Sequence, residues 1–352
     1  MKKMLALLLA LVMVLSLAAC ASSQPATTDA AASTETAETT ETTETTEPAA
    51  EESAEAPAES GKTYTVGVCQ LVQHEALDAA TQGFIDALKE ELGDAVTVDA
   101  QNASGDSVNC GTIVNGFVSK GVDLIMANAT PALTAAVSAT ADIPILGTSI
   151  TAYGVALDID DFNGTVGGNV SGTSDLADLQ AQAQMILDWF PETKTVGLLC
   201  CSAEPNSRYQ IDEVRKALEA QGVTCEEFAF TDSNDVSSVT QKAADFSDVV
   251  YIPTDNTAAS NTEAIANVLI PAGVPAICGE EGLCRGCGVA TLSISYYDLG
   301  VTTGKMAAKI LKGEADISTM PVEYTDATPK YNASVCEQLG ITPLDGYEAI
   351  EG

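Results

Sequence analysis

Basic residues are scarce in this sequence. Lysine and arginine together number 15 against 50 aspartates and glutamates, which gives a formal net charge of −35. Binding to nucleic acid, or to another polyanion, needs clusters of lysine and arginine, so this composition argues against such partners. For most of the carboxylates we expect no role beyond solubility.

Catalytic signatures are also missing. The only histidine is His74; Glu75 follows it, but Asp78 stands where a zinc-protease pattern needs a second histidine. The chain contains no G-x-S-x-G and no Walker A loop, so hydrolase and nucleotide-binding functions lack their defining residues. Cys284 and Cys287 form a lone C-x-x-C without the second pair that a zinc site needs. The sequence therefore predicts no cofactor and no metal, and it leaves a local disulfide or two free thiols open for this pair.

One long apolar run lies at the N-terminus. It covers Leu5–Ala19, after the basic pair Lys2-Lys3, and is too short to span a bilayer comfortably. The run ends in Leu17-Ala18-Ala19-Cys20, which resembles the lipobox of bacterial lipoproteins. The resemblance implies that residues 1–20 are a lipoprotein signal peptide region, with cleavage before Cys20 and lipid on its sulfur. An ordinary secretory signal that ends by chance at a cysteine is the alternative.

Residues 21–61 have low complexity and no basic or aromatic side chain. Such a segment cannot bury enough apolar surface to fold, so we predict a disordered acidic tether. As a flexible coil it would span roughly 35 Å. The folded body then begins at residue 62 and contains nine cysteines, an odd number that cannot all pair within the chain.

The body repeats itself at a spacing of about 130 residues. Thr65–Cys69 matches Thr195–Cys200 as a buried strand, and an amphipathic helical pattern follows each. Strands and helices alternate through both halves, which predicts parallel sheets with helices on both faces. We therefore predict an α/β fold of two Rossmann-like lobes joined by a hinge. The first lobe covers 62–170 and is completed by about 296–324; the second covers 171–295 and is completed by about 325–345.

Two strand-to-helix junctions predict where a ligand binds. Asp123–Ala132 and Asp248–Thr257 each begin as an apolar strand and end in residues that suit a helix N-cap. In open α/β sheets, ligands bind outside the carboxyl ends of the strands, and backbone N–H groups there suit a carboxylate. Glu280-Glu281 follows another strand, where it is either a solvated loop or a partner for a ligand ammonium.

A set of short motifs spread over Thr63–Ile341 carries a family resemblance. In chain order these motifs are Gln73–Asp78 with Gly83-Phe84, Gln101–Ala103 with Gly105-Asp106, Ala129–Pro131, Gly172–Asp175, Asn206-Ser207, Pro253–Thr257, Gly279–Gly282, Tyr296-Tyr297 with Leu299-Gly300, and Pro321–Tyr324. Together they resemble the substrate-binding lipoproteins of ABC importers in the tryptophan/tyrosine (aromatic amino acid) group.

The resemblance implies a periplasmic-binding-protein-like fold of type I, whose lobes close over a small molecule and deliver it to a membrane permease. Two positions depart from the family pattern, because Ala152 and Ser295 stand where a carboxylate is usual. A buried ligand ammonium needs a carboxylate partner, so the loss of these two carboxylates affects which solute can be bound. The ligand contacts that the resemblance implies are Glu75, Thr130, Thr148, Asn206, Ser207, Asp255, Asn256 and Glu281.

From these observations we expect an extracytoplasmic solute-binding protein that is monomeric, anchored to the membrane through lipid on Cys20, and not an enzyme. Its expected solute is an amino acid or related carboxylate, aromatic ones included, and its expected partner is an ABC permease. One alternative is a surface sensor that presents the solute to a receptor. Another is an enzyme on the same scaffold that uses His74 or the Cys284/Cys287 pair.

Overall fold

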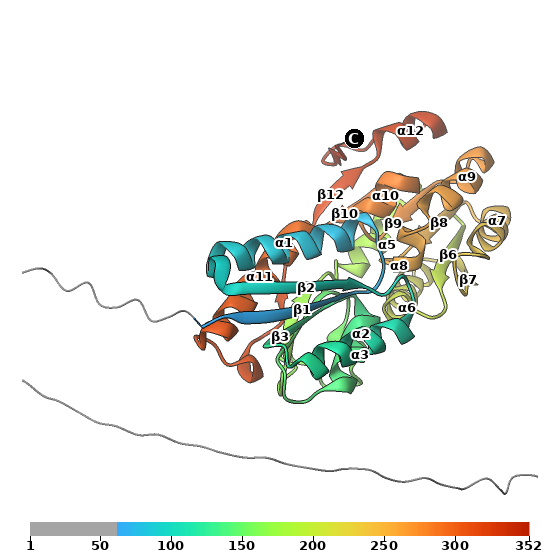
Figure 1. Ribbon diagram of the computed structural model, residues 1–352. Helices are drawn as coiled ribbons and strands as arrows, with labels where there is room; N and C mark the ends of the chain where they lie inside the picture. Colours follow the sequence, from blue (N-terminus) through green and yellow to red (C-terminus); the bar gives the residue numbers. More distant parts are fainter. Residues whose placement is uncertain (1–61, 352) are drawn as a thin grey trace, which may run out of the picture. The chain divides into compact units, whose positions relative to one another are not determined.

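The computed structural model describes residues 62–351 (Figure 1). The predicted signal peptide, the lipidation site Cys20 and the tether at 21–61 lie outside the described residues, so all three stay predictions. Within residues 62–351 no helix is long and apolar enough to cross a membrane. The strands of this part form two sheets, and each sheet organises one α/β lobe.

The first lobe is built on a six-stranded parallel sheet with the order β11-β5-β4-β3-β1-β2. Side chains alternate across it, so that Val68 faces the core under α1 and α11 while Cys69 faces the core under α2 and α3. The strands are β1 (Tyr64–Gln70), β2 (Val96–Asn102), β3 (Leu124–Asn128), β4 (Ile145–Ile150), β5 (Val170–Ser174) and β11 (Glu323–Tyr324). The helices are α1 (Glu75–Leu92), α2 (Ser107–Lys120), α3 (Thr130–Ala139), α4 (Tyr153–Ala156) and α11 (Tyr296–Lys312), with 3-10 turns η1 (Gly93–Ala95) and η2 (Ile317–Thr319).

The second lobe has a seven-stranded sheet with the order β13-β12-β10-β9-β8-β6-β7, in which β12 runs antiparallel to β10. Its strands are β6 (Thr195–Cys201), β7 (Thr224–Phe230), β8 (Val249–Ile252), β9 (Ala276–Cys278), β10 (Ala290–Ser293), β12 (Thr328–Tyr331) and β13 (Glu348–Ala349). Its helices are α5 (Leu179–Trp189), α6 (Pro205–Glu219), α7 (Val236–Phe246), α8 (Asn256–Ala259), α9 (Thr262–Ala272), α10 (Glu281–Cys287) and α12 (Ala333–Leu339).

The two lobes share one strand order. The series β2-β1-β3-β4-β5 of the first sheet returns as β7-β6-β8-β9-β10 in the second. Equivalent hydrogen bonds recur as well: the Asp123 carboxylate accepts from the backbone N–H of Thr65 at 2.7 Å, and the Asp248 carboxylate accepts from that of Thr195 at 2.9 Å. The predicted fold class of two Rossmann-like lobes is confirmed.

The chain crosses between the sheets three times, after β5, after β10 and after β11. The first sheet extends through Ser174, so the lobe boundary predicted at residue 170 falls inside β5 and is corrected to about residue 175. β5 is short and rich in small polar residues, which hid it in the sequence. It is a strand because other elements cover it: Ser171 donates to the carbonyl of Met320 at 2.9 Å, and the hydroxyls of Thr173 and Thr303 lie 2.8 Å apart.

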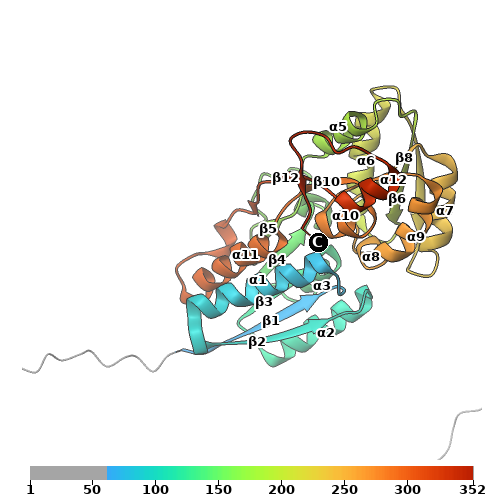
Figure 2. The same ribbon diagram turned by 90° about the horizontal axis from the view of Figure 1, so that it is seen from above.

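Helix α11 follows the second lobe in the chain but packs on α1 of the first, and both figures show the two helices side by side (Figures 1 and 2). Two glycines allow this close approach. A Cβ atom on Gly300 would lie 2.0 Å from the Ala80 carbonyl oxygen, and one on Gly83 would lie 2.1 Å from the Tyr297 carbonyl oxygen. This contact joins Tyr296, at the N-terminus of α11, to the first lobe.

Gly300→Ala tests this contact. Since the added methyl group meets rigid backbone, we expect the free energy of unfolding to fall by about 2–3 kcal/mol. The matched control is Gly116→Ala in α2, where an added Cβ meets nothing within 4 Å and better helix propensity should raise stability by about 0.5–1 kcal/mol. Urea denaturation measures both, and equal stabilities of the two variants would contradict the packing described.

Candidate ligand-binding site

The lobes meet at the carboxyl ends of their strands. At the chain crossings between them, the hydroxyl of Tyr296, the first residue of α11, donates to the Asp175 carboxylate, just after β5, at 2.9 Å. Nε2 of His74 lies 3.3 Å from Oδ1 of Asn256 in the second lobe, and Glu75 forms an ion pair with Arg285. The predicted arrangement, two strand edges that face each other, is therefore present.

Three hollows open where the lobes meet, and the smallest, of about 360 Å³, is lined by His74, Glu75 and Arg285, among others. Of the two larger hollows, one of about 390 Å³ is lined by Ser104–Ser107 and Pro131 of the first lobe and by Glu204, Asn256 and Thr257 of the second. The other, of about 450 Å³, is lined by Glu75, Glu280, Glu281, Tyr296 and Lys330, among others. All three volumes are in the range of small-molecule sites.

Glu204, which sequence analysis did not single out, organises the second-lobe edge. Its buried carboxylate accepts from the backbone N–H groups of Asn256 and Thr257 at 3.0 and 2.9 Å. It also accepts from the side chains of the same two residues at 2.7 and 2.8 Å. A signal was present, since Glu204 lies at the carboxyl end of β6 and directly before Pro205, the first residue of α6.

Asp255 is buried and caps α8, where its carboxylate accepts from the backbone N–H groups of Ala258 at 2.8 Å and Cys201 at 2.6 Å. Burial raises the pKa of this carboxyl, and the nearby charge of Glu204 raises it further. The expectation that α8 offers free N–H groups to a ligand carboxylate is therefore wrong, because the carboxylates of Glu204 and Asp255 already occupy them.

Asn206 and Ser207 are buried in the first turn of α6. The Asn206 amide nitrogen donates to the carbonyl of Thr254 at 3.0 Å and to Glu204 at 3.2 Å, while its Oδ1 is buried without a hydrogen-bond partner. A buried acceptor without a donor is costly, so this oxygen is suited to a donor group that a ligand brings.

The two carboxylates that follow β9 differ in environment. Glu280 is buried and accepts from the backbone N–H groups of Gly282 and Leu283, and burial raises its pKa to about 7. Glu281 is engaged by Arg285 at 2.9 Å, by Lys330 at 2.7 Å and by the Ser293 hydroxyl at 2.6 Å. Neither carboxylate lies in a solvated loop, because both belong to the start of α10.

In the first lobe, Thr130 and Thr148 are both buried near the ends of β3 and β4. Thr130 begins α3, after Ala129, whose φ of 88° marks a tight turn. The Thr148 hydroxyl lies 3.2 Å from those of both Thr173 and Thr303. Thr148 therefore holds β4, β5 and α11 together, and the structure does not direct its hydroxyl toward the second lobe.

Asp175 lies in the crossing segment after β5, Tyr296 begins α11 directly after the next crossing, and both are buried. Oδ2 of Asp175 accepts from the Tyr296 hydroxyl, whereas Oδ1 is buried without a partner. Burial raises the pKa of Asp175, and the Tyr296 and Thr151 side chains act in the opposite direction. The sequence contains the motif Gly172–Asp175, but nothing in that motif indicates that its carboxylate is enclosed.

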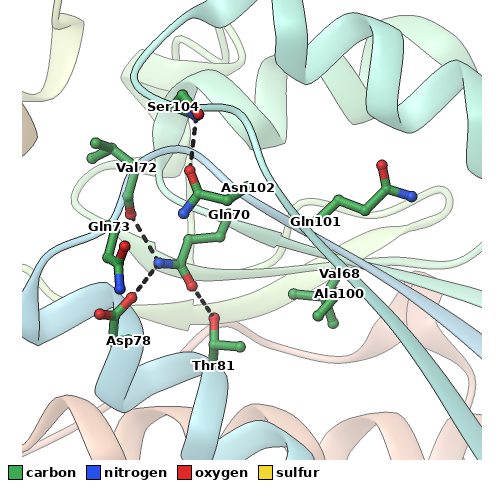
Figure 3. A pocket seen from close by; sticks show the side chains of 10 residues that line it. All are labelled: Val68, Gln70, Val72, Gln73, Asp78, Thr81, Ala100, Gln101, Asn102 and Ser104. Atoms are coloured by element: carbon green, nitrogen blue, oxygen red, sulfur yellow. Dashed lines mark hydrogen bonds between the residues drawn. The ribbon is translucent and has the colours of Figure 1, made fainter.

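A further hollow of about 580 Å³ lies on the first lobe, over β1 and β2 (Figure 3). The Gln70 side chain at its centre donates to Asp78 at 2.6 Å and to the carbonyl of Val72 at 2.8 Å, and accepts from Thr81 at 2.6 Å. These partners satisfy Gln70, and the contacts fix the start of α1 against β1.

The Cys284/Cys287 pair lies in helix α10, and all nine cysteines in residues 62–351 are free thiols. Cys287 donates to the Leu283 carbonyl, one turn earlier, at 3.3 Å. In the same range, no group of three or more His, Cys, Asp or Glu side chains is placed to hold a metal ion.

Two duplicated α/β lobes, three crossing segments and a polar cleft at the strand ends define a two-lobed solute-binding protein. Residues 65–346 match the ABC transporter substrate binding protein family, and the chain belongs to that family.

Three similar proteins make the likeness more specific. The tyrosine-binding protein of Clostridioides difficile (strain R20291) is 33% identical over 276 residues, which is 77% of this chain and 79% of that protein. An ABC domain from Streptococcus pneumoniae in complex with L-Trp is 32% identical, with a TM-score of 0.78 over 82% of this chain and all of that one. The ligand-free, open structure of a substrate-binding protein with adhesive properties from Clostridium difficile is also 32% identical, with a TM-score of 0.63 over 82% of this chain and 99% of that one.

Stability should depend on pH through Glu280. Folding raises the pKa of Glu280 from 4.5 to about 7. The contribution of Glu280 to the free energy of unfolding is therefore complete below pH 4.5 and is lost as the pH rises through 7. Relative to the wild type, Glu280→Gln should therefore gain about 2–3 kcal/mol of unfolding free energy between pH 4.5 and 8.

Urea denaturation across this pH range measures the difference between the two proteins. The exposed Glu337→Gln in α12 serves as the control. A difference between wild type and Glu280→Gln that stays constant with pH would show that Glu280 does not carry a raised pKa.

Proposed function

We propose that this chain is the extracytoplasmic solute-binding component of an ABC importer and that it captures an aromatic L-amino acid between its lobes. One observation carries the proposal. At the same 32% identity and 82% coverage, the chain superposes with a TM-score of 0.78 on the L-Trp complex but 0.63 on the ligand-free, open relative. The arrangement of the lobes thus supports a closed, binding-competent state, and the tyrosine-binding relative supports the ligand class.

The buried acceptors support a ligand with an ammonium group. Ala152 and Ser295 lack the carboxylates that the family pattern led us to expect, and Ser295 instead caps α11 through the backbone N–H of Asp298. Asp175 Oδ1 and Asn206 Oδ1 are buried and lack donors. We propose that the ligand ammonium donates to Oδ1 of Asp175, because a charge-assisted hydrogen bond would relieve the cost of burying the Asp175 charge, and that Oδ1 of Asn206 accepts from another donor of the ligand.

Of the contacts implied by the family resemblance, we retain Thr130 from the first lobe and Asn206 and Ser207 from the second. The polar groups of Asp255, Asn256 and Glu281 already have partners in the protein, so these residues support the site. Thr148 supports the first lobe in the same way, and Glu75 pairs with Arg285.

Delivery of the solute to a permease and anchoring through Cys20 complete the proposal. The similar proteins with a stated activity are binding proteins rather than enzymes, which agrees with the lack of a catalytic signature.

Thermal shift and calorimetry on the purified protein test the ligand class. We expect L-Tyr, L-Trp or both to raise the melting temperature, with about 2.7 kcal/mol of added stability at 100 times the dissociation constant. Compounds that lack the ammonium group, such as indole-3-propionate, should bind at least tenfold more weakly. Stabilisation by a sugar or an aliphatic amino acid, with none by aromatic ones, would contradict the proposal.

Asp175→Asn tests the ammonium site. This variant keeps an acceptor for Tyr296 but removes the charge, so affinity for the aromatic amino acid should fall by about tenfold or more. Stability should be maintained, because burial raises the pKa of Asp175 and so disfavours its charged form, a cost that a neutral amide does not carry. Asp178→Asn, an exposed cap of α5 three residues away, is the matched control. Unchanged affinity by calorimetry would remove Asp175 from the site.

A further inference from the structure

Two consecutive residues at the N-terminus of α1 reach across to different elements of the second lobe. His74 contacts Asn256 in α8, and Glu75 contacts Arg285 in α10. The backbones are close here as well, because a Cβ atom on Gly282 in the first turn of α10 would lie 3.5 Å from Cβ of Glu75. One end of a first-lobe helix is therefore attached at two points to the opposite lobe.

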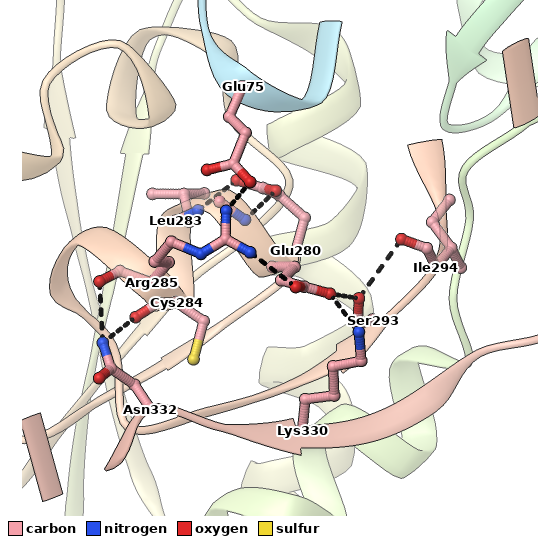
Figure 4. A network of polar contacts seen from close by, with 11 residues as sticks. Glu75, Glu280, Leu283, Cys284, Arg285, Ser293, Ile294, Lys330 and Asn332 are labelled. Atoms are coloured by element: carbon pink, nitrogen blue, oxygen red, sulfur yellow. Dashed lines mark hydrogen bonds and ion pairs between the residues drawn. The ribbon is translucent and has the colours of Figure 1, made fainter. Parts of the chain in front are cut away.

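Arg285 is held in place by contacts within the second lobe, in addition to its ion pair with Glu75 in the first (Figure 4). Its Nη2 donates to Glu281 at 2.9 Å, and Glu281 is fixed in turn by Lys330 and Ser293. The Asn332 amide donates to the Arg285 carbonyl at 2.8 Å and so fixes the backbone of α10. Nη1 is then aimed across the lobe boundary at Glu75.

Arg285 neutralises two carboxylates that come from different lobes. Glu281 belongs to α10 and Glu75 to α1, and the same guanidinium contacts both. Without it, Lys330 would still pair with Glu281, but Glu75 would have no cation to pair with across the boundary, which favours separation of the lobes. Asn256, the partner of His74, is likewise held from within the second lobe by Glu204.

We propose that His74, Glu75, Asn256 and Arg285 form an interlobe clasp that stabilises the closed arrangement, with Arg285 as the positioning residue that sets how long the solute is retained. Glu75 is then a closing contact and not a ligand contact. The role in solute retention rests on the proposed function, in which the solute is an aromatic L-amino acid. The clasp itself can be measured without a solute.

Dissociation kinetics measure retention. Glu75→Gln and Arg285→Gln should each raise the dissociation rate of L-Trp or L-Tyr about threefold to fivefold, a modest change because the pair is partly exposed. The double variant should dissociate no faster than the faster single variant, since both changes break one contact. The wild-type rate should also rise between about 50 mM and 500 mM salt, and the variants should respond less.

Arg208→Gln is the matched control, because Arg208 forms an ion pair with Glu227 inside the second lobe. Its dissociation rate should match that of the wild type. Additive effects of the two clasp changes, or dissociation rates equal to that of the control, would overturn the proposal.

His74 gives a readout that needs no solute, because it is the only histidine in the chain. Burial between the lobes lowers its pKa, while Asn256 and the charges of Glu204 and Asp78 act in the opposite direction. In the ligand-free protein we expect NMR of labelled histidine to give a pKa below 6.5, and Glu75→Gln to raise it through opening. If the lobes stayed closed, loss of the negative charge of Glu75 would lower the pKa of His74. The direction of the pKa change therefore distinguishes opening of the lobes from a purely electrostatic effect.

A His74 pKa that stays the same or falls in Glu75→Gln would overturn the clasp. A rise in that pKa, together with no binding of L-Tyr or L-Trp, would preserve the clasp and reject the proposed solute. The two proposals can therefore fail separately.

Discussion

The structure depends on the geometry of parallel strands, whose carboxyl ends all point to one edge of a sheet. The residues that contact the opposite lobe follow such ends, with His74 and Glu75 after β1 and Asn256 after β8. So do Asp175, after β5, and Tyr296, after β10, which meet where the chain crosses between the sheets. Because the sheet is duplicated, two polar edges of the same kind meet. The position of the candidate site therefore follows from the strand order of the two sheets and does not depend on any single side chain.

Within this frame, the two lobes contribute differently. The second-lobe edge is internally satisfied, since Glu204, Asp255 and Glu280 receive backbone N–H groups from α8, α10 and the end of β6. This makes it a rigid surface with few unpartnered groups. Several buried acceptors have no donor, and among them we propose Oδ1 of Asn206 and Oδ1 of Asp175 as the positions that bind a ligand's donor groups.

Much of the fold could be predicted from the sequence because it rests on local patterns. Apolar runs such as Val66–Cys69, helix-ending glycines and the repeat at about 130 residues are visible without coordinates. The sequence does not predict β5, because its small polar residues form a strand only where α11 and β11 cover and pair with it. The site was predicted less well: that Glu204 would occupy the N–H groups of α8, and that Arg285 would engage Glu75, depends on side chains more than 50 residues apart in the chain.

The central claim is that one solute is enclosed between the two strand edges. A crystal structure of the protein grown with L-Trp or L-Tyr tests it most directly. We predict ligand density in contact with both lobes, with the ammonium on the free oxygen of Asp175, another ligand donor on that of Asn206, and the Glu75–Arg285 pair formed. Ligand bound to one lobe alone, or bound while the two edges stand apart, would contradict it.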